Sequence, residues 1–456
     1  MKTYQDFLAL GESKEKRADF LLSAVKLHRQ SAEYQTALIA EEYDKKQNTT
    51  ITKYQKILHT LSGQAVEDVF SSNHKTVSGF FPAFVTQLNQ YLLGNGMTLE
   101  NPSNKEKLGA DFDTKLQQAG RLALVEGISF GFWNLDRLEI FSIKEFVPIW
   151  DEETGALRAG IRFWQLSADK PLRLTFYEEK GYTEYIKYTD KDLEERVPFR
   201  AYRQVVKTDG LGNEEIMDGE SYPGFPIIPL YANPHHLSEI VGIRQSIDCY
   251  DLVKSGFAND IDDASMIYWT LENTGGMDEM DLARFVQRMK TIHAAAGGVD
   301  GGKVEAHTLE VPYAAREAML NRIKSDLYQD FQIINVQELS SGAKTATEIR
   351  AAYQPMDNKA DQYEYCILDF LNALFFIVGI EDSPKFTRSR IINQLEETQM
   401  VLMAAQYLDD ETILNKLPWL TQEEVEDIMN RKVDEEVVRV GTATEEKPPD
   451  ETILEE

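Results

Sequence analysis

The chain has 456 residues, 42 % of them hydrophobic, and its 76 acidic and 48 basic side chains give a formal net charge of -28. A chain of this length accommodates roughly two to four domains with substantial cores. The acidic balance excludes tight, sequence-independent binding of nucleic acid, because such binding depends on lysine and arginine neutralising phosphates.

The sequence contains few features that indicate a cellular compartment. Cys249 and Cys366 fall within predicted apolar helices and are expected to be small buried residues in a reducing compartment. The first ten residues lack a basic region followed by an apolar run, so no signal peptide is predicted. The longest apolar stretch, 366–380, is too short to span a bilayer. We therefore expect a soluble protein made in a cytoplasm, with no membrane partner.

The first half of the chain changes from helical to strand periodicity near residue 130. Apolar residues at helical spacing predict helices over 13–46, 75–93 and 105–127, the last two ending at glycines. Short runs rich in aromatic and β-branched residues then alternate with turn signals, which predicts an antiparallel β region. The predicted strands are Leu138–Ile143, Val147–Trp150, Gly160–Trp164, Leu172–Tyr177, Thr183–Tyr188 and Tyr202–Val206. The proline-rich stretch 222–229 is predicted to be an extended link.

Two amphipathic segments, 237–262 and 312–334, are predicted to be returning helices that form an arm. The apolar stripe is narrow and seam-like, and the opposite side of the first helix carries acidic residues expected to be solvated. An isolated two-helix arm would leave the flanks of this stripe exposed, so we expect its residues to be covered by another chain. They are Ile240, Ile243, Ile247, Tyr250, Val253 and Phe257 on the first helix and Leu327 and Phe331 on the second. Between them, 263–311 is predicted to be a compact insert of a strand, a helix (278–292), a glycine turn and a second strand.

A loop at 335–344 follows the arm and precedes a long helix. Thr345 and Glu348 have the spacing of a capping box, so a helix is predicted to start there, and Pro355 should kink it. Two shorter helices, 389–407 and 421–435, are predicted farther on, with a connection at 410–418. The charged segment 441–456 is expected to be disordered.

Signals for catalysis are weak. Residues 297–303 have the spacing of a phosphate loop, but Val304 stands where a serine or threonine should hold magnesium, and a strand follows instead of a helix. Asp260 and Asp263 share a helix face without recognisable metal-ligand spacing. The pair His235–His236 has no second metal pair and is expected at the surface or at a helix cap. We expect no enzymatic activity, no cofactor and no metal.

The loop Ser340–Lys344 is small and flexible and carries one cation. It is interpreted either as an ordinary connection between helices or as a loop that touches a polymeric ligand.

Four motifs in order resemble the portal proteins of tailed double-stranded DNA bacteriophages, in the long-tailed branch that infects Gram-positive hosts. Phe84–Gly96 is similar to that family's early helix with its aromatic-Leu-X-Gly end. Pro226–Asn233, followed by Ile247–Tyr250 and Ser255–Asp260, resembles the entry into the family's stem. Ser341–Ala343 resembles the start of its tunnel helix. Phe386–Arg388 with Tyr407–Pro418 resembles its last helical segment.

The resemblance implies an α+β, mainly helical portal fold. The α/β wing would be 1–236, the two-helix stem 237–262 and 312–334, and the small α/β clip 263–311. The tunnel loop would be 335–344, the long kinked helix 345–384, the small helical crown 385–440 and an acidic tail 441–456.

The resemblance also implies a homo-oligomeric ring, commonly of twelve subunits, at one vertex of the virion capsid, assembled in the host cytoplasm. Double-stranded DNA would enter and leave through this ring. The implied partners are the terminase large subunit, scaffolding and major capsid proteins, and head-completion adaptor or tail proteins. Because an acidic wall repels DNA towards the centre, a few contacts would steady it, and the candidates in the tunnel loop are Ser340, Ser341, Gly342, Lys344 and Thr345. The alternatives are a helical cytoplasmic scaffold or a metal-dependent nucleic-acid enzyme that uses Asp260.

Overall fold

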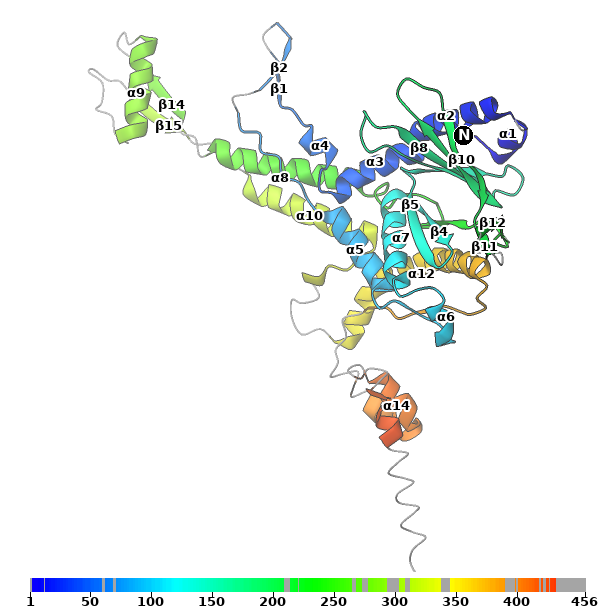
Figure 1. Ribbon diagram of the computed structural model, residues 1–456. Helices are drawn as coiled ribbons and strands as arrows, with labels where there is room; N and C mark the ends of the chain where they lie inside the picture. Colours follow the sequence, from blue (N-terminus) through cyan, green and yellow to red (C-terminus); the bar gives the residue numbers. More distant parts are fainter. Residues whose placement is uncertain are drawn as a thin grey trace, which may run out of the picture. The chain divides into compact units, whose positions relative to one another are not determined.

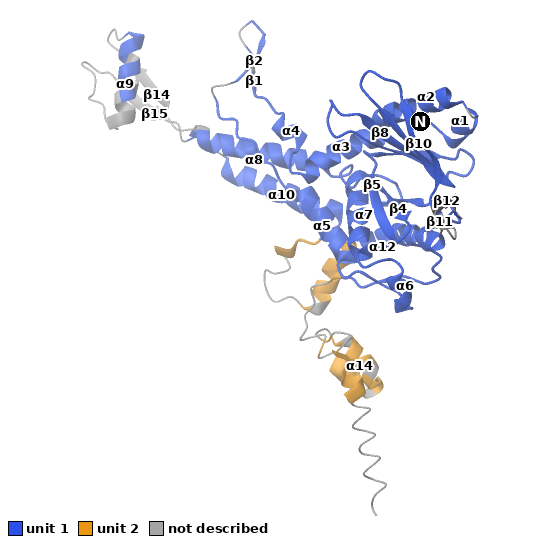
Figure 2. Ribbon diagram, in the orientation of Figure 1, with its two compact units in different colours: residues 1–333, 358–388 blue, residues 334–357, 389–456 orange. Residues whose placement is uncertain are grey.

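The computed structural model describes residues 2–11, 13–59, 62–68, 71–208, 214–219, 221–264, 268–272, 278–292, 303–307, 312–337, 345–389, 398, 401–417, 420, 424–425 and 427–431. The chain divides into two compact units (Figure 2). Unit 1 comprises 1–333 and 358–388, and unit 2 comprises 334–357 and 389–456. The fold is mixed α/β, with α-helices and antiparallel sheets.

In place of the predicted helix 13–46 the N-terminal region holds two helices, with one short helix before them and one after. These are α1 (Tyr4–Leu8), α2 (Lys14–Arg29), α3 (Ala32–Asp44) and α4 (Thr49–Thr52). The predicted helix 13–46 is interrupted because Ser31 caps α3, its Oγ accepting the N–H of Tyr34 at 3.2 Å. The side chain of Gln35 also donates to the carbonyl of Arg29 at 2.7 Å, which secures the break.

The next three helices are α5 (Phe80–Leu93), α6 (Pro102–Glu106) and α7 (Phe112–Glu126). Of these, α5 and α7 end where the sequence predicts, whereas α6 was not predicted and α7 starts later than the predicted residue 105. After α5 the left-handed residue is Gly96, at φ +73°, and α7 ends on Gly127 at φ +91°, conformations that favour glycine. The start of α5 differs from the prediction, because residues 75–79 are not helical.

A five-stranded antiparallel sheet of order β10-β9-β8-β7-β6 forms the first layer of unit 1 (Figure 1). Its strands are β6 (Phe146–Trp150), β7 (Leu157–Trp164), β8 (Leu172–Glu178), β9 (Gly181–Lys187) and β10 (Glu194–Ala201). Helices α1 and α2 cover one face, and Phe7, Phe20 and Leu21 share a buried core with Ile161 and Phe176.

A three-stranded antiparallel sheet of order β13-β4-β5 packs against α7. It contains β4 (Ile128–Asn134), β5 (Arg137–Ser142) and β13 (Ile227–Tyr231). The predicted extended link therefore ends in a strand, with Ile227 opposite Phe132 and Pro229 opposite Phe130. Proline is tolerated there because β13 is an edge strand of this sheet.

Among the described residues outside the arm, unit 1 also contains three short antiparallel pairs. They are β1 (Ile57–His59) with β2 (Ala65–Glu67), β11 (Gln204–Thr208) with β12 (Glu214–Asp218), and β3 (Met97–Thr98) with β16 (Lys385–Phe386).

The arm is formed by α8 (Arg244–Ala264) and α10 (Tyr313–Phe331), which lie side by side (Figure 1). The insert between them contains β14 (Tyr268–Glu272), α9 (Glu279–Ile292) and β15 (Lys303–His307), and the two strands pair antiparallel. The predicted order of strand, helix and strand is confirmed. The glycine turn 297–302 lies outside the described residues. The first arm helix starts later than predicted, because residues 239–243 form turns.

The long helix α12 (Ala346–Val378) contains Pro355, as predicted, and passes through both units. Farther on, α14 (Asp410–Lys416) replaces the predicted connection at 410–418. It starts there because Asp409 caps it, its Oδ2 accepting the N–H of Thr412 at 3.0 Å. A 3-10 turn, η1 (Ala405–Tyr407), precedes it. The segment 441–456 lies outside the described residues.

Candidate functional site

An aromatic contact and an ion pair join the end of α8 to the start of α10. The rings of Phe257 on α8 and Tyr313 on α10 meet edge to face, with centroids 5.6 Å apart. Close by, Arg316 of α10 forms an ion pair with Asp260 of α8. The aspartate considered as a metal ligand therefore already has a cationic partner.

The root of the arm is buried in unit 1. Five of the eight predicted stripe residues are enclosed by their own chain: Ile240, Ile243, Ile247, Leu327 and Phe331. Because these five side chains are covered by their own chain, they are not available to pack against a neighbouring subunit as predicted. The half-buried Tyr250, Val253 and Phe257 are the stripe residues still accessible to one.

Helix α5 supplies the aromatic surface on which this root packs. Phe80 meets Tyr250 edge to face at 4.9 Å between centroids. Phe84 contacts Tyr328 at 4.9 Å and Phe331 at 5.0 Å. Helix α5 therefore contacts both arm helices, with Phe80 on α8 and Phe84, the first residue of the Phe84–Gly96 motif, on α10.

A largely buried ion pair fixes α12 against the same root. The ammonium of Lys359 contacts the Glu239 carboxylate and lies 3.7 Å from the centroid of the Phe331 ring. Both charged side chains are mostly removed from solvent, so each compensates the desolvation of the other. Losing either partner would leave a buried charge.

The other side of α8 carries polar side chains that hold an extended segment, residues 72–78. Backbone N–H groups of this segment donate to α8 as follows: Ser78 to Oδ1 of Asp251 at 2.9 Å, Thr76 to Oγ of Ser255 at 2.9 Å, and His74 to Oδ1 of Asn259 at 2.6 Å. The hydroxyl of Ser72 donates to Asp262. We call Asp251, Ser255, Asn259 and Asp262 the polar ladder.

The polar ladder forms because the rise of one helical turn nearly equals the rise of two residues in an extended chain. Four residues of an α-helix advance about 6 Å, and two residues of an extended chain advance about 6.6 Å. Every second N–H of segment 72–78 therefore meets a side chain one helical turn farther along α8. The segment runs antiparallel to the helix, and its backbone donors are satisfied without a strand partner at these positions.

Three of the four polar-ladder residues are buried, contrary to the predicted solvated face, whereas Asp262 is exposed. Asp251 is 0 % exposed, Ser255 3 % and Asn259 5 %. Cys249, predicted to be buried, is exposed instead. The polar spacing on α8 did not reveal this burial, because polar side chains of a helix can hydrogen-bond to the backbone of another segment as well as to water.

Asp251 is the most polar of these buried groups. Burial raises the pKa of its carboxyl, although hydrogen bonds from Asn48 and Ser78 oppose the shift. The neighbouring Asp248 accepts hydrogen bonds from the hydroxyls of Thr50 (2.8 Å) and Tyr43. Residues 43–50 and 72–78 thus converge on one side of α8.

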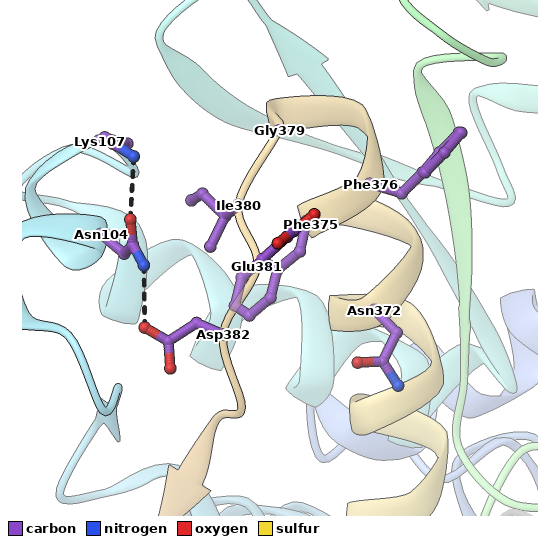
Figure 3. A pocket seen from close by; sticks show the side chains of 9 residues that line it. All are labelled: Asn104, Lys107, Asn372, Phe375, Phe376, Gly379, Ile380, Glu381 and Asp382. Atoms are coloured by element: carbon purple, nitrogen blue, oxygen red, sulfur yellow. Dashed lines mark hydrogen bonds between the residues drawn. The ribbon is translucent and has the colours of Figure 1, made fainter.

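A cavity near the end of α12 has a volume of about 570 Å³ and is lined by Asn104, Lys107, Asn372, Phe376, Glu381 and Asp382, among others (Figure 3). The carboxylate of Asp382 accepts hydrogen bonds from the N–H groups of Glu100 (3.0 Å) and Asn101 (3.1 Å) and from the amide of Asn104 (3.0 Å). The Asn104 hydrogen bond is the largest of the effects that lower the pKa of Asp382 to about 2. This residue is an anchor between segments rather than a general base.

The described part of the chain offers little support for the alternative hypotheses of a catalytic or metal site. No group of three or more His, Cys, Asp or Glu residues there could hold a metal ion. His236 stacks on Tyr231, with ring centroids 3.6 Å apart, which fits the predicted surface role. Across the same residues, none of the helices is both long and apolar enough to span a bilayer.

The tunnel-loop candidates lie mostly outside the described residues, namely Ser340, Ser341, Gly342 and Lys344. Thr345 is described and exposed, and its capping box is confirmed. Its N–H donates to Oε2 of Glu348 at 2.9 Å, and its Oγ1 accepts the N–H of Glu348 at 3.3 Å.

Pro355 lies inside α12, where it cannot donate to the carbonyl of residue 351. The boundary between the two units falls between Asp357 and Asn358, two residues later. The kink itself stays a prediction.

Comparison with known proteins places this geometry in a family. Residues 24–436 match the family model described as phage portal protein, SPP1 Gp6-like. The chain is 24 % identical over 419 residues to the portal protein of Bacillus phage SPP1, covering 82 % of this chain and 79 % of that protein. It is 23 % identical over 317 residues to the portal protein of Clostridium phage phiCD119, covering 67 % and 68 % respectively. Among solved structures, the neck of an empty GTA particle matches with a TM-score of 0.42 and 11 % identity, covering 74 % of this chain and 88 % of that one.

Proposed function

Because the chain belongs to the SPP1 Gp6-like family of phage portal proteins, we propose that it is the subunit of a ring at one capsid vertex through which viral DNA is packaged and ejected. In this proposal residues 1–236 form the wing, 237–262 and 312–334 the stem, and 263–311 the clip. Residues 335–344 form the tunnel loop, 345–384 the kinked helix and 385–440 the crown. The protein acts as a structural component of the virion and not as an enzyme.

The two-helix arm is the observation that best supports this proposal. Its root is fixed inside unit 1 by buried apolar residues and by the Lys359–Glu239 pair, while Tyr313 and Met319 on α10 and Ile261 on α8 stay exposed. Exposed apolar side chains beyond a firmly held root suit a helix pair that neighbouring copies cover. A closed ring gives every copy the same two neighbours.

The channel wall is proposed to include Ser340, Ser341, Gly342 and Lys344, with Thr345 at the helix start. Since the Thr345 hydroxyl also donates to Glu348 at 3.1 Å, it serves the helix cap and is the weaker candidate for contact with DNA. We propose that ring symmetry repeats the Lys344 contact around an otherwise acidic wall.

The clip is the proposed docking surface for other proteins. The insert with β14, α9 and β15 is joined to the arm at both ends and forms its own small antiparallel pair. We propose that it binds the terminase large subunit during packaging and head-completion or tail proteins afterwards. Scaffolding and major capsid proteins would meet the wing.

Negative-stain microscopy and sedimentation velocity of the purified full-length protein test the proposal. We expect closed rings with a central hole and a sedimentation coefficient that far exceeds that of a 52.1 kDa monomer. A folded protein that stays monomeric at high concentration would overturn the ring.

A further inference from the structure

The five-stranded sheet of unit 1 is wider than the helix that covers it. Helix α2 packs on β6 and β7, and its buried apolar residues share a core with residues of β6, β7 and β8. Strand β10 lies at the edge of this sheet, and Ala201 is its one buried residue. The end of the sheet formed by β9 and β10 is therefore only partly covered by α2.

A cleft of about 700 Å³ opens between α2 and this end of the sheet. Half-buried apolar side chains line it, namely Leu22 of α2, Tyr185 of β9 and Leu193, which precedes β10. Phe199 of β10 also lines the cleft and is 49 % exposed. Apolar side chains that stay partly exposed in a concave surface are typical of a binding site.

The rim of the cleft carries carboxylates that have no partner. Glu15 and Asp19 lie on α2, and Asp192 lies in the turn between β9 and β10. All three residues are exposed, and within the described part of the chain none of them forms a hydrogen bond or an ion pair. Carboxylates on both walls of a cleft attract a cationic ligand.

The basic residues among the lining of the cleft are already engaged. The ammonium of Lys14 pairs with Glu195 at 3.1 Å. The Nε of Arg17 donates to the carbonyl of Gly11 at 2.9 Å, and its guanidinium lies 5.3 Å from the centroid of the Phe7 ring. The charge left for a ligand is therefore negative, which disfavours nucleic acid as the occupant.

The open edge of β10 is a poorer docking surface than the cleft. Pro198 lacks an N–H group, and the register with β9 shifts between Glu195 and Val197 and again between Val197 and Arg200. A proline and irregular pairing protect an edge strand from extension by another chain. A ligand is therefore expected to contact the side chains of the cleft instead of adding a strand to the sheet.

We propose that this cleft binds a basic, extended peptide segment of another protein. Successive side chains of an extended chain point to opposite sides, so alternating basic and apolar residues fit an apolar floor between acidic walls. The apolar residues of the segment cover Leu22 and Phe199, and its cations reach Asp19 and Asp192. A small cation alone would leave the apolar floor uncovered. The inference goes beyond the proposed ring, because every residue of the cleft belongs to unit 1 of one copy.

Fluorescence anisotropy of the full-length protein at low salt tests the proposal, with a short labelled peptide of alternating lysine and leucine as the probe. We expect Asp19→Asn/Asp192→Asn to bind the probe about fivefold more weakly than wild type, because two exposed rim charges are lost. The matched control is Asp136→Asn/Asp369→Asn, which removes two exposed carboxylates elsewhere in unit 1 and should bind like wild type. Equal affinity of all three proteins would indicate general attraction to an acidic chain and overturn the proposal.

The apolar floor and the position of the probe are tested separately. Phe199→Ser should also weaken binding, and a peptide of alternating lysine and glycine should bind wild type more weakly than the lysine–leucine probe. Hydrogen exchange should slow at residues 14–22 and 183–199 when the probe is bound. Slower exchange confined to other parts of the chain would overturn the assignment of the cleft.

The result can be separated from the outcome for the proposed function. Probe binding by monomers that is lost in rings would mean that a neighbouring copy fills the cleft, and it would overturn a peptide of another protein as the occupant. A wild-type protein that binds the probe as expected but never forms rings would overturn the proposed function and leave the cleft as a peptide site.

Discussion

Asp251 is fully buried, yet each of its two carboxylate oxygens has a donor. Oδ1 accepts the N–H of Ser78, and Oδ2 accepts the side-chain amide of Asn48. Because these donors belong to segments far away in the sequence, one side chain of α8 holds both the α3–α4 region and the segment before α5. A buried carboxylate with such bonds connects separate segments of the fold. Removing it leaves its buried hydrogen-bond donors without an acceptor, which destabilises the folded state.

We expect Asp251→Ala to lower the free energy of unfolding by about 2–5 kcal/mol, because two buried donors lose their acceptor. Chemical denaturation followed by circular dichroism measures the change. The control is Asp369→Ala, which removes an exposed acid from α12 and should change stability by less than about 0.5 kcal/mol. Equal effects of the two substitutions would contradict the role of Asp251.

At the scale of elements, periodicity predicted the helices that have one apolar face. These are α5, α7, α8, α10 and α12, and the capping box at Thr345 and Glu348 gave the start of the last. Strand β4 was missed because its residues are buried on both faces except the last, so no alternation appears. Strand β13 was missed because Pro229 is tolerated only at the edge of a sheet, which a single segment does not reveal.

The same limit applies to the candidate site. The apolar stripe of α8 was predicted from its spacing, but the role of Asp251, Ser255 and Asn259 was not. Polar residues at helical spacing look alike whether they face water or the backbone of a segment nearly two hundred residues away. Only the positions of residues 72–78 distinguish the two cases.

Asp382 offers an element-scale test of how the end of α12 is held. Its pKa is about 2 in the folded protein, below the ordinary value of 3.8, because donors from residues 100–104 stabilise the carboxylate. A lowered pKa means that this stabilisation is present above pH 4 and is lost as the pH falls through the folded value. We expect Asp382→Asn to lower the melting temperature at pH 7, and the difference from wild type to narrow as the pH falls from 4 towards 2. Thermal melts at several pH values measure it, and a gap that stays constant with pH would rule out the carboxylate as the anchor.

For the whole molecule, the net charge of -28 bears directly on the proposed passage of DNA through a ring. Duplex DNA presents a charge roughly every 1.7 Å along its axis, so a wall rich in lysine and arginine would bind it strongly and slow its passage. An acidic wall instead keeps the polymer away from the surface. A small number of cations at the narrowest point would then position DNA without retaining it, and ring symmetry would place them evenly.

Lys344→Ala tests this balance in an infectious-particle assay. We expect ring and procapsid assembly to be unchanged and the amount of packaged DNA to fall, because the proposed channel loses its repeated cation. Lys344→Arg should package normally if charge is what matters, since arginine stays positively charged. The matched control is Lys180→Ala, which removes an exposed lysine from the turn between β8 and β9. Normal packaging by Lys344→Ala would remove Lys344 from the channel, whereas equal losses in both alanine variants would indicate that overall charge, and not this position, governs the passage of DNA.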